Sequence, residues 1–295
     1  MRIGAVSSRT RTATLVILAG ALTACAPPQT ALTQLLDARR VASEIHVQFT
    51  QAADASNRAV MADTDPVAAA AADEARKARG ALERNVDTLR SLLQSLGYGD
   101  DLRTLDAFNG RFEEYRRLDD EILPLAVENT NVKAQRLSFG PAQEAAEAFR
   151  VALDRAVMTG DSKESWRSQA LAARALSAVR RVQVLQAPHI AEANLTVMTR
   201  MEQEMTASEA EARSTVRQLT AVLPASHAAP LADAVAALDR FAETGRQIVA
   251  LSRRNSDVHS LALSLGRKRT VVAECETQLR ALDQSLASHA FTATR

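Results

Sequence analysis

His189 and Glu192 come nearest to a chemical site in their residue types and spacing. Residues i and i+3 of a helix lie on one face, so this imidazole and carboxylate match one element of a di-metal centre in a helical bundle. Such a centre needs about four carboxylates and two histidines directed into one core. The remaining histidines lie at unrelated positions of the helical repeat: His46, His227, His259 and His289. We therefore expect His189 to be a capping or surface residue, and we predict no metal site.

Other catalytic patterns are missing from the sequence. It contains no Gly-rich phosphate loop, HExxH, CxxC or G-x-S-x-G element. An acidic run is predicted to be a solvated helix face: Glu202, Glu204, Glu209 and Glu211. The 36 basic and 35 acidic residues leave a net charge of +1, without the basic excess typical of nucleic-acid binders. We predict no enzyme, no cofactor and no nucleic-acid partner.

A polar cluster is expected at two predicted turns, near residues 61–66 and 128–131. In an up-down-up-down bundle, the turn after the first helix and the turn after the third lie at the same end. This places six candidate ligand- or partner-binding residues together: Asp63, Asp65, Glu128, Asn129, Asn131 and Lys133. The alternative interpretation is that these residues serve only to cap helices and form turns.

The elements that position these residues are predicted to be helices. Hydrophobic residues make up 46% of the chain but aromatic residues only 3%, with 10 Gly and 8 Pro, which is typical of alanine- and leucine-rich helices and not of strands. Between Leu35 and Ala59, apolar and small residues recur at alternating steps of three and four, which predicts one buried seam. Asp65 is the predicted N-cap of the second helix. Kinks are expected at Pro124 and at Gly140–Pro141.

An internal repeat indicates duplication. Residues 122–140 (ILPLAVENTNVKAQRLSFG) return as residues 248–266 (IVALSRRNSDVHSLALSLG) at a constant offset of 126. We predict an all-α fold of two tandem antiparallel up-down-up-down four-helix bundles, one over residues 31–160 and a diverged copy over residues 161–295.

The N-terminus resembles the signal of bacterial lipoproteins. A basic leader and a short apolar stretch end in Leu22-Thr23-Ala24-Cys25, which is similar to a lipobox. The resemblance implies that residues 1–24 are a cleaved signal peptide, with cleavage between Ala24 and Cys25. Cys25 would then be acylated and anchor the chain to a membrane through a tether over residues 25–30. Because Ala26 and not an aspartate follows Cys25, the resemblance implies that the protein is anchored in the outer membrane, facing the periplasm, more than in the inner membrane. Cys275, the only other cysteine, is expected to be a half-buried packing residue.

Three segments resemble the four-helix-bundle sensory domain of methyl-accepting chemotaxis receptors: Ser56–Ala62, Asp87–Leu93 and Ile122–Ala134. The similarity covers roughly residues 32–158 and lies in helix lengths and turn positions. It implies a periplasmic, non-catalytic sensor-like module that binds a ligand or partner in signal transduction. No residue of the receptors' ligand site can be carried over, and the usual second membrane helix and signalling module have no counterpart here. A homodimer, or a receptor or envelope protein, is the expected partner. The alternative is a structural envelope lipoprotein whose bundles scaffold a membrane complex.

Overall fold

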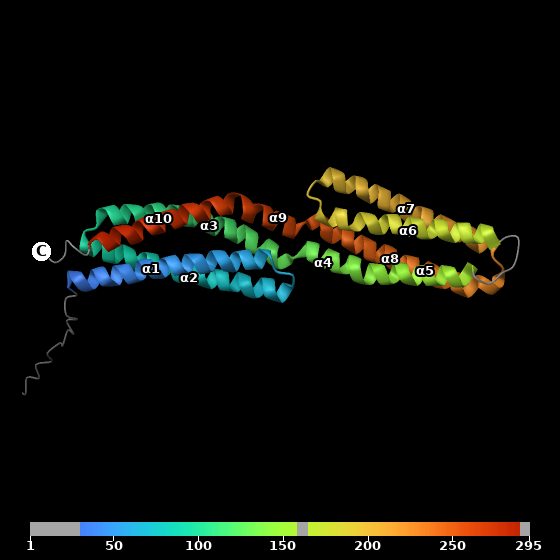
Figure 1. The fold of residues 1–295 in the computed structure, drawn as a ribbon, viewed down its shortest axis with the longest axis horizontal. Coiled ribbons are helices and arrows are strands. Elements are labelled where there is room, and N and C mark those ends of the chain that lie inside the picture. Colours follow the sequence, from blue (N-terminus) through green and yellow to red (C-terminus); the bar gives the residue numbers. More distant parts are fainter. Residues whose placement is uncertain (1–29, 158–164, 290–295) are drawn as a thin grey trace, which may run out of the picture.

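The computed structural model describes residues 30–157 and 165–289, and every regular element in these ranges is a helix (Figure 1). This confirms the predicted all-α fold class. In chain order the elements are α1 (Ala31–Val60), α2 (Asp65–Leu96), α3 (Gly99–Glu128), α4 (Thr130–Leu137), the π-helical segment η1 (Ser138–Ala142), α5 (Gln143–Val157), α6 (Ser165–Ala191), α7 (Leu195–Val222), the 3-10 turn η2 (Ala225–His227), α8 (Ala228–Arg254), α9 (Ser256–Leu263), the π-helical segment η3 (Ser264–Lys268) and α10 (Arg269–Ser288).

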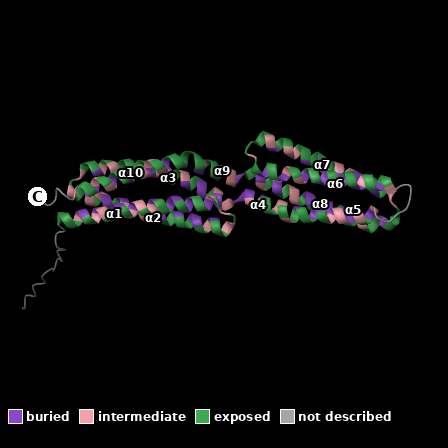
Figure 2. Cartoon of the chain, viewed as in Figure 1, coloured by how far each residue is buried: buried purple, intermediate pink, exposed green. Residues whose placement is uncertain are grey.

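The seam predicted in α1 is buried along its whole length. Leu35, Ile45 and Phe49 are at most 1% exposed, and the small residues between Ala52 and Ala59 that continue the same stripe are also buried. Figure 2 shows this pattern in the other helices, with buried residues on one side and exposed residues on the opposite side. The 3.6-residue period therefore selects the packed face of each helix.

The helix ends follow the local sequence. The side-chain hydroxyl of Thr30 accepts a hydrogen bond from the backbone N–H of Thr33 at the start of α1. The N-cap of α2 is Thr64 and not the predicted Asp65. Asp65 lies in the first turn, where its negative charge interacts favourably with the positive end of the helix dipole. Gly97 ends α2 with φ of 72°, a left-handed conformation that glycine adopts without steric cost.

Two bundles lie end to end along the molecule (Figure 1). Bundle one consists of α1, α2 and α3 together with α9, η3 and α10. Bundle two consists of α6, α7 and α8 together with α4, η1 and α5. Residues 99–157 form one interrupted helix that passes through both bundles, and residues 228–288 form a second that passes in the opposite direction. At a rise of about 1.5 Å per residue, residues 99–157 span about 90 Å.

The helices that pack together therefore differ from the predicted units of residues 31–160 and 161–295. Residues 130–157 were assigned to the first unit, but their buried side chains pack with those of α6 and α8. The C-terminal helix was assigned to the second unit, but Val271, Leu279 and Leu286 pack with α1 and α3. The reason is that the chain does not reverse at Asn129 or Asn255. It continues into the other bundle, so each half of the repeat gives its fourth helix to the bundle of the other half.

Two π-helical segments interrupt the fourth helices at equivalent places. The kink predicted at Gly140–Pro141 takes this form, because Pro141 has no N–H to donate to the helical ladder. In the second copy Gly266 lies at φ −87° and ψ −112°, outside the helical range. Such segments re-aim the side chains that follow them.

Candidate functional site

The two copies of the repeat meet where the fourth helices cross between the bundles. We call this place the waist, defined as residues 128–133 and 254–259. Asn129 and Asn255 adopt left-handed conformations, with φ of 52° and 54°, and end α3 and α8. Asparagine tolerates this conformation better than other residues with a Cβ atom. The same break is therefore made twice, 126 residues apart.

The helices that begin at the waist cap each other. The N–H of Thr130 donates to Oγ of Ser256 at 3.0 Å, and the N–H of Ser256 donates to Oγ1 of Thr130 at 3.1 Å. One residue further on, the N–H of Asn131 donates to Oδ2 of Asp257 at 2.6 Å, and the N–H of Asp257 donates to Oδ1 of Asn131 at 3.3 Å. Burial raises the pKa of Asp257, whereas the backbone hydrogen bonds that its carboxylate accepts act to lower it. Each helix therefore finds its N-terminal caps on the other copy of the repeat.

Some members of the predicted polar cluster lie together at the waist, between the two bundles. Nζ of Lys133 lies 2.9 Å from Oδ2 of Asp65 and donates to the backbone carbonyl of Glu128 at 2.7 Å. Arg136 donates to the backbone carbonyl of Asp63. The carboxylate of Glu128 pairs with Arg254, in the other copy. These contacts join the α1–α2 turn to the crossing helices.

The amide of Asn131 is also engaged within the protein. Its Nδ2 donates to the carbonyl of Ile190 at 2.6 Å and to Oδ1 of Asn255 at 2.7 Å. Nδ2 of Asn255 in turn donates to the carbonyl of Glu192 at 2.6 Å. The side-chain amide of Asn129 is fully buried without a hydrogen-bond partner in the protein. The geometry at the waist thus favours the turn and capping interpretation of the predicted cluster over a ligand site.

His189 is not the capping or surface residue that was expected. It is fully buried, and its Nε2 lies 2.8 Å from Oε1 of Glu202 on α7, not beside Glu192. Arg253 binds the same carboxylate through two contacts of 2.7 Å, and its hydrogen bond is the main reason that the pKa of Glu202 is lowered. Carboxylates of the acidic run are likewise paired with arginines, as Glu211 is with Arg174 and Arg181. The described residues contain no group of His, Cys, Asp and Glu able to hold a metal ion.

A buried ion cluster in bundle one was missed by the sequence analysis. We define it as Ser56, Arg79, Asp119 and Lys268, from four different helical elements. Nζ of Lys268 lies 3.0 Å from Oδ1 of Asp119, and Ser56 bonds to both groups. Nη1 of Arg79 approaches Oδ2 of Asp119 at 3.4 Å. Asp119 and Lys268 are at most 1% exposed, so the cluster replaces their hydration.

The setting of Lys268 explains how a charge is accommodated there. It is the last residue of η3, and its Nζ lies 5.3 Å from the ring centroid of Tyr115, within the range of a cation–π contact. Burial lowers the pKa of Lys268, and the charge of Asp119 acts in the opposite direction. Burial also raises the pKa of Tyr115 well above its usual value. The sequence does contain an indication of this ion cluster. Asp119 is a charged residue between Tyr115 and Ile122 on the apolar stripe of α3.

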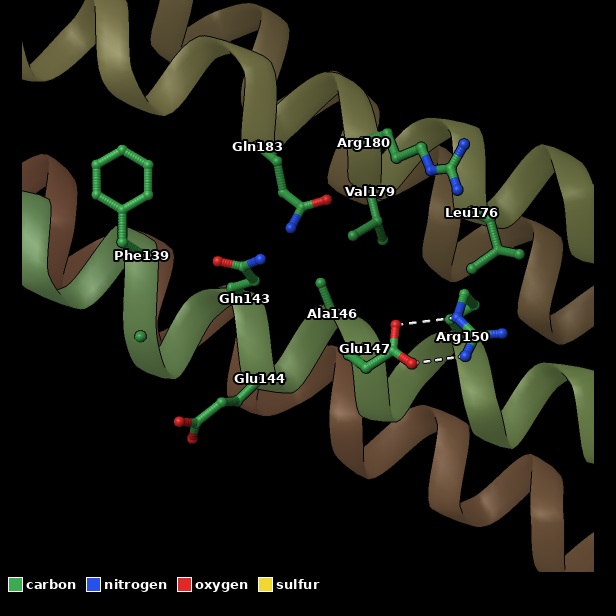
Figure 3. Close-up of a pocket in the computed structure, with 11 residues that line it drawn as sticks. Phe139, Gln143, Glu144, Ala146, Glu147, Arg150, Leu176, Val179, Arg180 and Gln183 are labelled. Carbon is green, nitrogen blue, oxygen red and sulfur yellow. Dashed lines mark hydrogen bonds and ion pairs between the residues drawn. The ribbon is translucent and has the colours of Figure 1, made fainter.

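A groove opens between α5 and α6 on bundle two (Figure 3). It measures about 700 Å³. Leu176, Val179 and Ala146 provide apolar side chains, while Gln143 and Gln183 extend toward each other from opposite helices. Glu147 and Arg150 pair with each other along one side, at 2.5 Å. The groove therefore combines an apolar surface with uncommitted amides.

Phe139, presented by η1, lies at one end of this groove and is 63% exposed. Its equivalent in the repeat is Leu265 of η3, which is also 63% exposed and lines a smaller groove of about 400 Å³ against α1. Met61 and Leu261 line the same second groove. The duplication thus provides two related grooves, one on each bundle, each with an exposed apolar side chain from its π-helical segment.

Cys25 and the signal cleavage site lie outside the described residues. Cys275 is fully buried, more deeply than predicted, and burial raises the pKa of its thiol to about 12. Among the helices described, none is long and apolar enough to cross a membrane. Comparison with protein-family models gives no match to this chain, and comparison with curated proteins gives no significant match.

Proposed function

We propose that this protein is a lipid-anchored, non-catalytic binding module of the bacterial cell envelope, in which the groove between α5 and α6 receives a partner protein. The observation that supports this best is that the groove is open, is lined by both apolar and polar side chains, and presents the exposed Phe139 at one end, whereas the waist residues are bonded to one another. The lipobox-like sequence at Cys25 supports the anchor, and Ala26 favours the outer membrane.

The shape of the molecule supports a role in reaching a partner. Helix α1 begins at the end of bundle one that is far from bundle two (Figure 1). A chain tethered just before α1 would hold the α5–α6 groove on the bundle farther from the membrane. Its amides and apolar side chains suit an amphipathic helix of a partner, which needs both apolar contact and a hydrogen-bonding rim. A sensor-like role would then consist of partner binding, with any signal passed on by that partner.

The alternative function, a scaffold of an envelope complex, is favoured by one further observation. The second groove at Leu265 lies on bundle one, so a single chain presents two related docking places at different distances from its start. A scaffold would use both grooves, whereas a single-partner binding module would use the α5–α6 groove alone.

The proposal is tested by placing a photo-crosslinking amino acid at Phe139 in the full chain, in cells that make it naturally. We expect one discrete crosslinked partner, and its loss when Gln183→Arg introduces a charge into the groove at a partly exposed position. Val47, which is exposed on α1 to 53%, is the matched control position and should give no such adduct. The same adduct from Val47, or an unchanged adduct in the Gln183→Arg variant, would contradict groove binding. The same crosslinking amino acid placed at Leu265 distinguishes the two functions. A scaffold should also give an adduct there, whereas a single-partner module should not.

The anchor requires its own test. Cys25→Ser should abolish lipid labelling and leave the uncleaved precursor, because acylation needs the thiol. A mature, lipid-labelled Cys25→Ser protein would contradict the lipobox interpretation, and recovery of the parent solely in inner-membrane fractions would contradict the proposed outer-membrane location.

A further inference from the structure

The exchange of fourth helices raises the question of what prevents the alternative arrangement. If the chain reversed at Asn129 and Asn255, each half would fold on its own fourth helix. Many contacts of the two arrangements would be alike, because the halves are related by the repeat. Identical protomers can exchange an equivalent element at low cost, and mutations in the hinge promote such exchange. A feature that differs between the halves must therefore select the observed form.

The buried ion cluster is such a feature, because its members come from both halves. Ser56, Arg79 and Asp119 belong to the first half, and Lys268 belongs to the second. At the offset of 126, Asp119 corresponds to Gly245 and Lys268 corresponds to Ala142. The second half therefore has no carboxylate at the position of Asp119, and the first half has no lysine at the position of Lys268.

The alternative arrangement would leave Lys268 without Asp119 in bundle two, and in bundle one Asp119 would keep Arg79 but lose Lys268. Ala142 would face Asp119 in bundle one, and Lys268 would lie near Gly245 and Phe241 in bundle two. The space beside Gly245 is a hollow of about 280 Å³ that includes two carboxylates, Glu202 and Glu209. Both are already committed, Glu202 to Arg253 and Glu209 to Arg213. A buried charge without a partner is strongly destabilising, so Lys268 disfavours the alternative in bundle two. In bundle one Asp119 would lose one of its two cationic partners.

We propose that the Asp119–Lys268 ion cluster is the specificity determinant that places each fourth helix in the bundle of the other half. In some helical assemblies a buried polar residue selects one register or partner from several apolar alternatives. The residues around Gly245 and Ala142 complete the selection by offering no place for either charge.

The test moves the lysine from one half to the other in the full chain. Lys268→Ala with Ala142→Lys places the lysine on the fourth helix of the first half, so that only the alternative arrangement can pair it with Asp119. Two cysteine pairs report the outcome through a short bis-maleimide. Arg111→Cys with Glu274→Cys reports the observed arrangement, because these side chains form an ion pair at 3.2 Å. Arg111→Cys with Ala148→Cys reports the alternative, because Ala148 is the repeat equivalent of Glu274. In the observed arrangement residues 111 and 148 are separated by about 55 Å along one interrupted helix.

In the parent we expect only the crosslink between positions 111 and 274. In the lysine-transfer variant we expect that crosslink to fall at least tenfold and the crosslink between 111 and 148 to become the main product, both measured by mass spectrometry of the digested protein. Gln143→Arg with Arg269→Gln is the matched control. It exchanges the next residues between the halves, both exposed, and should leave the parent pattern unchanged.

A folded lysine-transfer variant that keeps only the 111–274 crosslink would overturn the proposal. If that variant fails to fold, Asp119→Leu with Lys268→Met decides, since neither arrangement then buries this pair of charges. We expect both crosslinks in this charge-free variant. The parent pattern alone would show that packing, and not the ion cluster, selects the exchange.

Discussion

The two bundles share one plan but fill their interiors differently. At equivalent positions of the repeat, bundle one has Tyr115 and Asp119 on its third helix, and bundle two has Phe241 and Gly245. In bundle one Phe49 contacts Phe108 and Tyr115 edge-on, with ring centroids 6.0 and 5.3 Å apart, beside the ion cluster. Bundle two has a hollow beside Gly245 at the equivalent level. The difference teaches that after duplication the same level of a four-helix bundle can be filled by large rings and a charge pair in one copy and carry a groove between helices in the other.

The largest loss of stability is expected for Asp119→Ala, which removes the carboxylate that pairs with the buried amine of Lys268. We expect a loss of about 3–5 kcal/mol in the free energy of unfolding. The measurement is urea denaturation followed by circular dichroism, on a chain that begins at Ala26. Asp120→Ala is the control, because this neighbouring carboxylate also pairs with Arg79 but is 59% exposed on its side chain. Equal losses in the two variants would show that burial of the pair is unimportant.

The two left-handed asparagines offer a matched test of the waist. Asn255→Gly keeps the backbone conformation but removes the hydrogen bonds to Glu192 and Asn131, so we expect a loss of about 1–3 kcal/mol. Asn129→Gly should be neutral or slightly stabilising, because its buried amide has no partner in the protein. Thermal unfolding of both variants checks the difference. Equal effects would mean that the amide hydrogen bonds of Asn255 contribute nothing.

Bundle two is expected to depend on pH through Glu202. Because Arg253 lowers its pKa below the ordinary value of 4.5, the ionised carboxylate stabilises the folded state above that pH, and this contribution is lost as the pH falls through the lowered pKa. Glu202→Gln should therefore cost about 1.5 kcal/mol at neutral pH and progressively less in acid. Urea midpoints of parent and variant between pH 7 and pH 3 test this. A difference that stays constant over this range would contradict the linkage.

The smallest effect is expected where bundle two is hollow. A Cβ atom added at Gly245 meets nothing within 4 Å, and alanine is the better helix former, so Gly245→Ala should stabilise by about 1 kcal/mol. Gly110→Ala, on the equivalent α3 of bundle one, is the matched control and also has open space. A gain at Gly110 but not at Gly245 would indicate that the hollow is needed by the fold.

Much of the helical architecture could be predicted from local sequence. The apolar stripe of α1, the glycine end of α2 and the Gly140–Pro141 interruption depend on neighbouring residues, and the structure has all three. The exchange of fourth helices could not be predicted in this way. A left-handed asparagine is compatible with either a reversal or a continuation of the chain, and only long-range contacts decide between them.

The candidate site shows the same limit. Asp65 and Lys133 were correctly predicted to meet, because the turn between α1 and α2 lies beside the end of α3 whether or not the chain reverses there. Their partners across the repeat, such as Asp257, depend on the crossing and were not predicted. Asp119 lay on an apolar stripe, but its counter-charge is 149 residues away. A polar residue on such a stripe indicates a buried pair without naming the partner.

The crossing at the waist also determines how the molecule bears a mechanical load. In an ordinary tandem protein a single linker joins the domains, and tension along the axis can draw them apart. Here two covalent backbones run through the waist in opposite directions, and each is embedded in a bundle at both ends. A pull along the axis must therefore shear packed helices past one another over many turns before the bundles can separate. The duplication has produced a strut that resists extension through its topology as well as through its contacts.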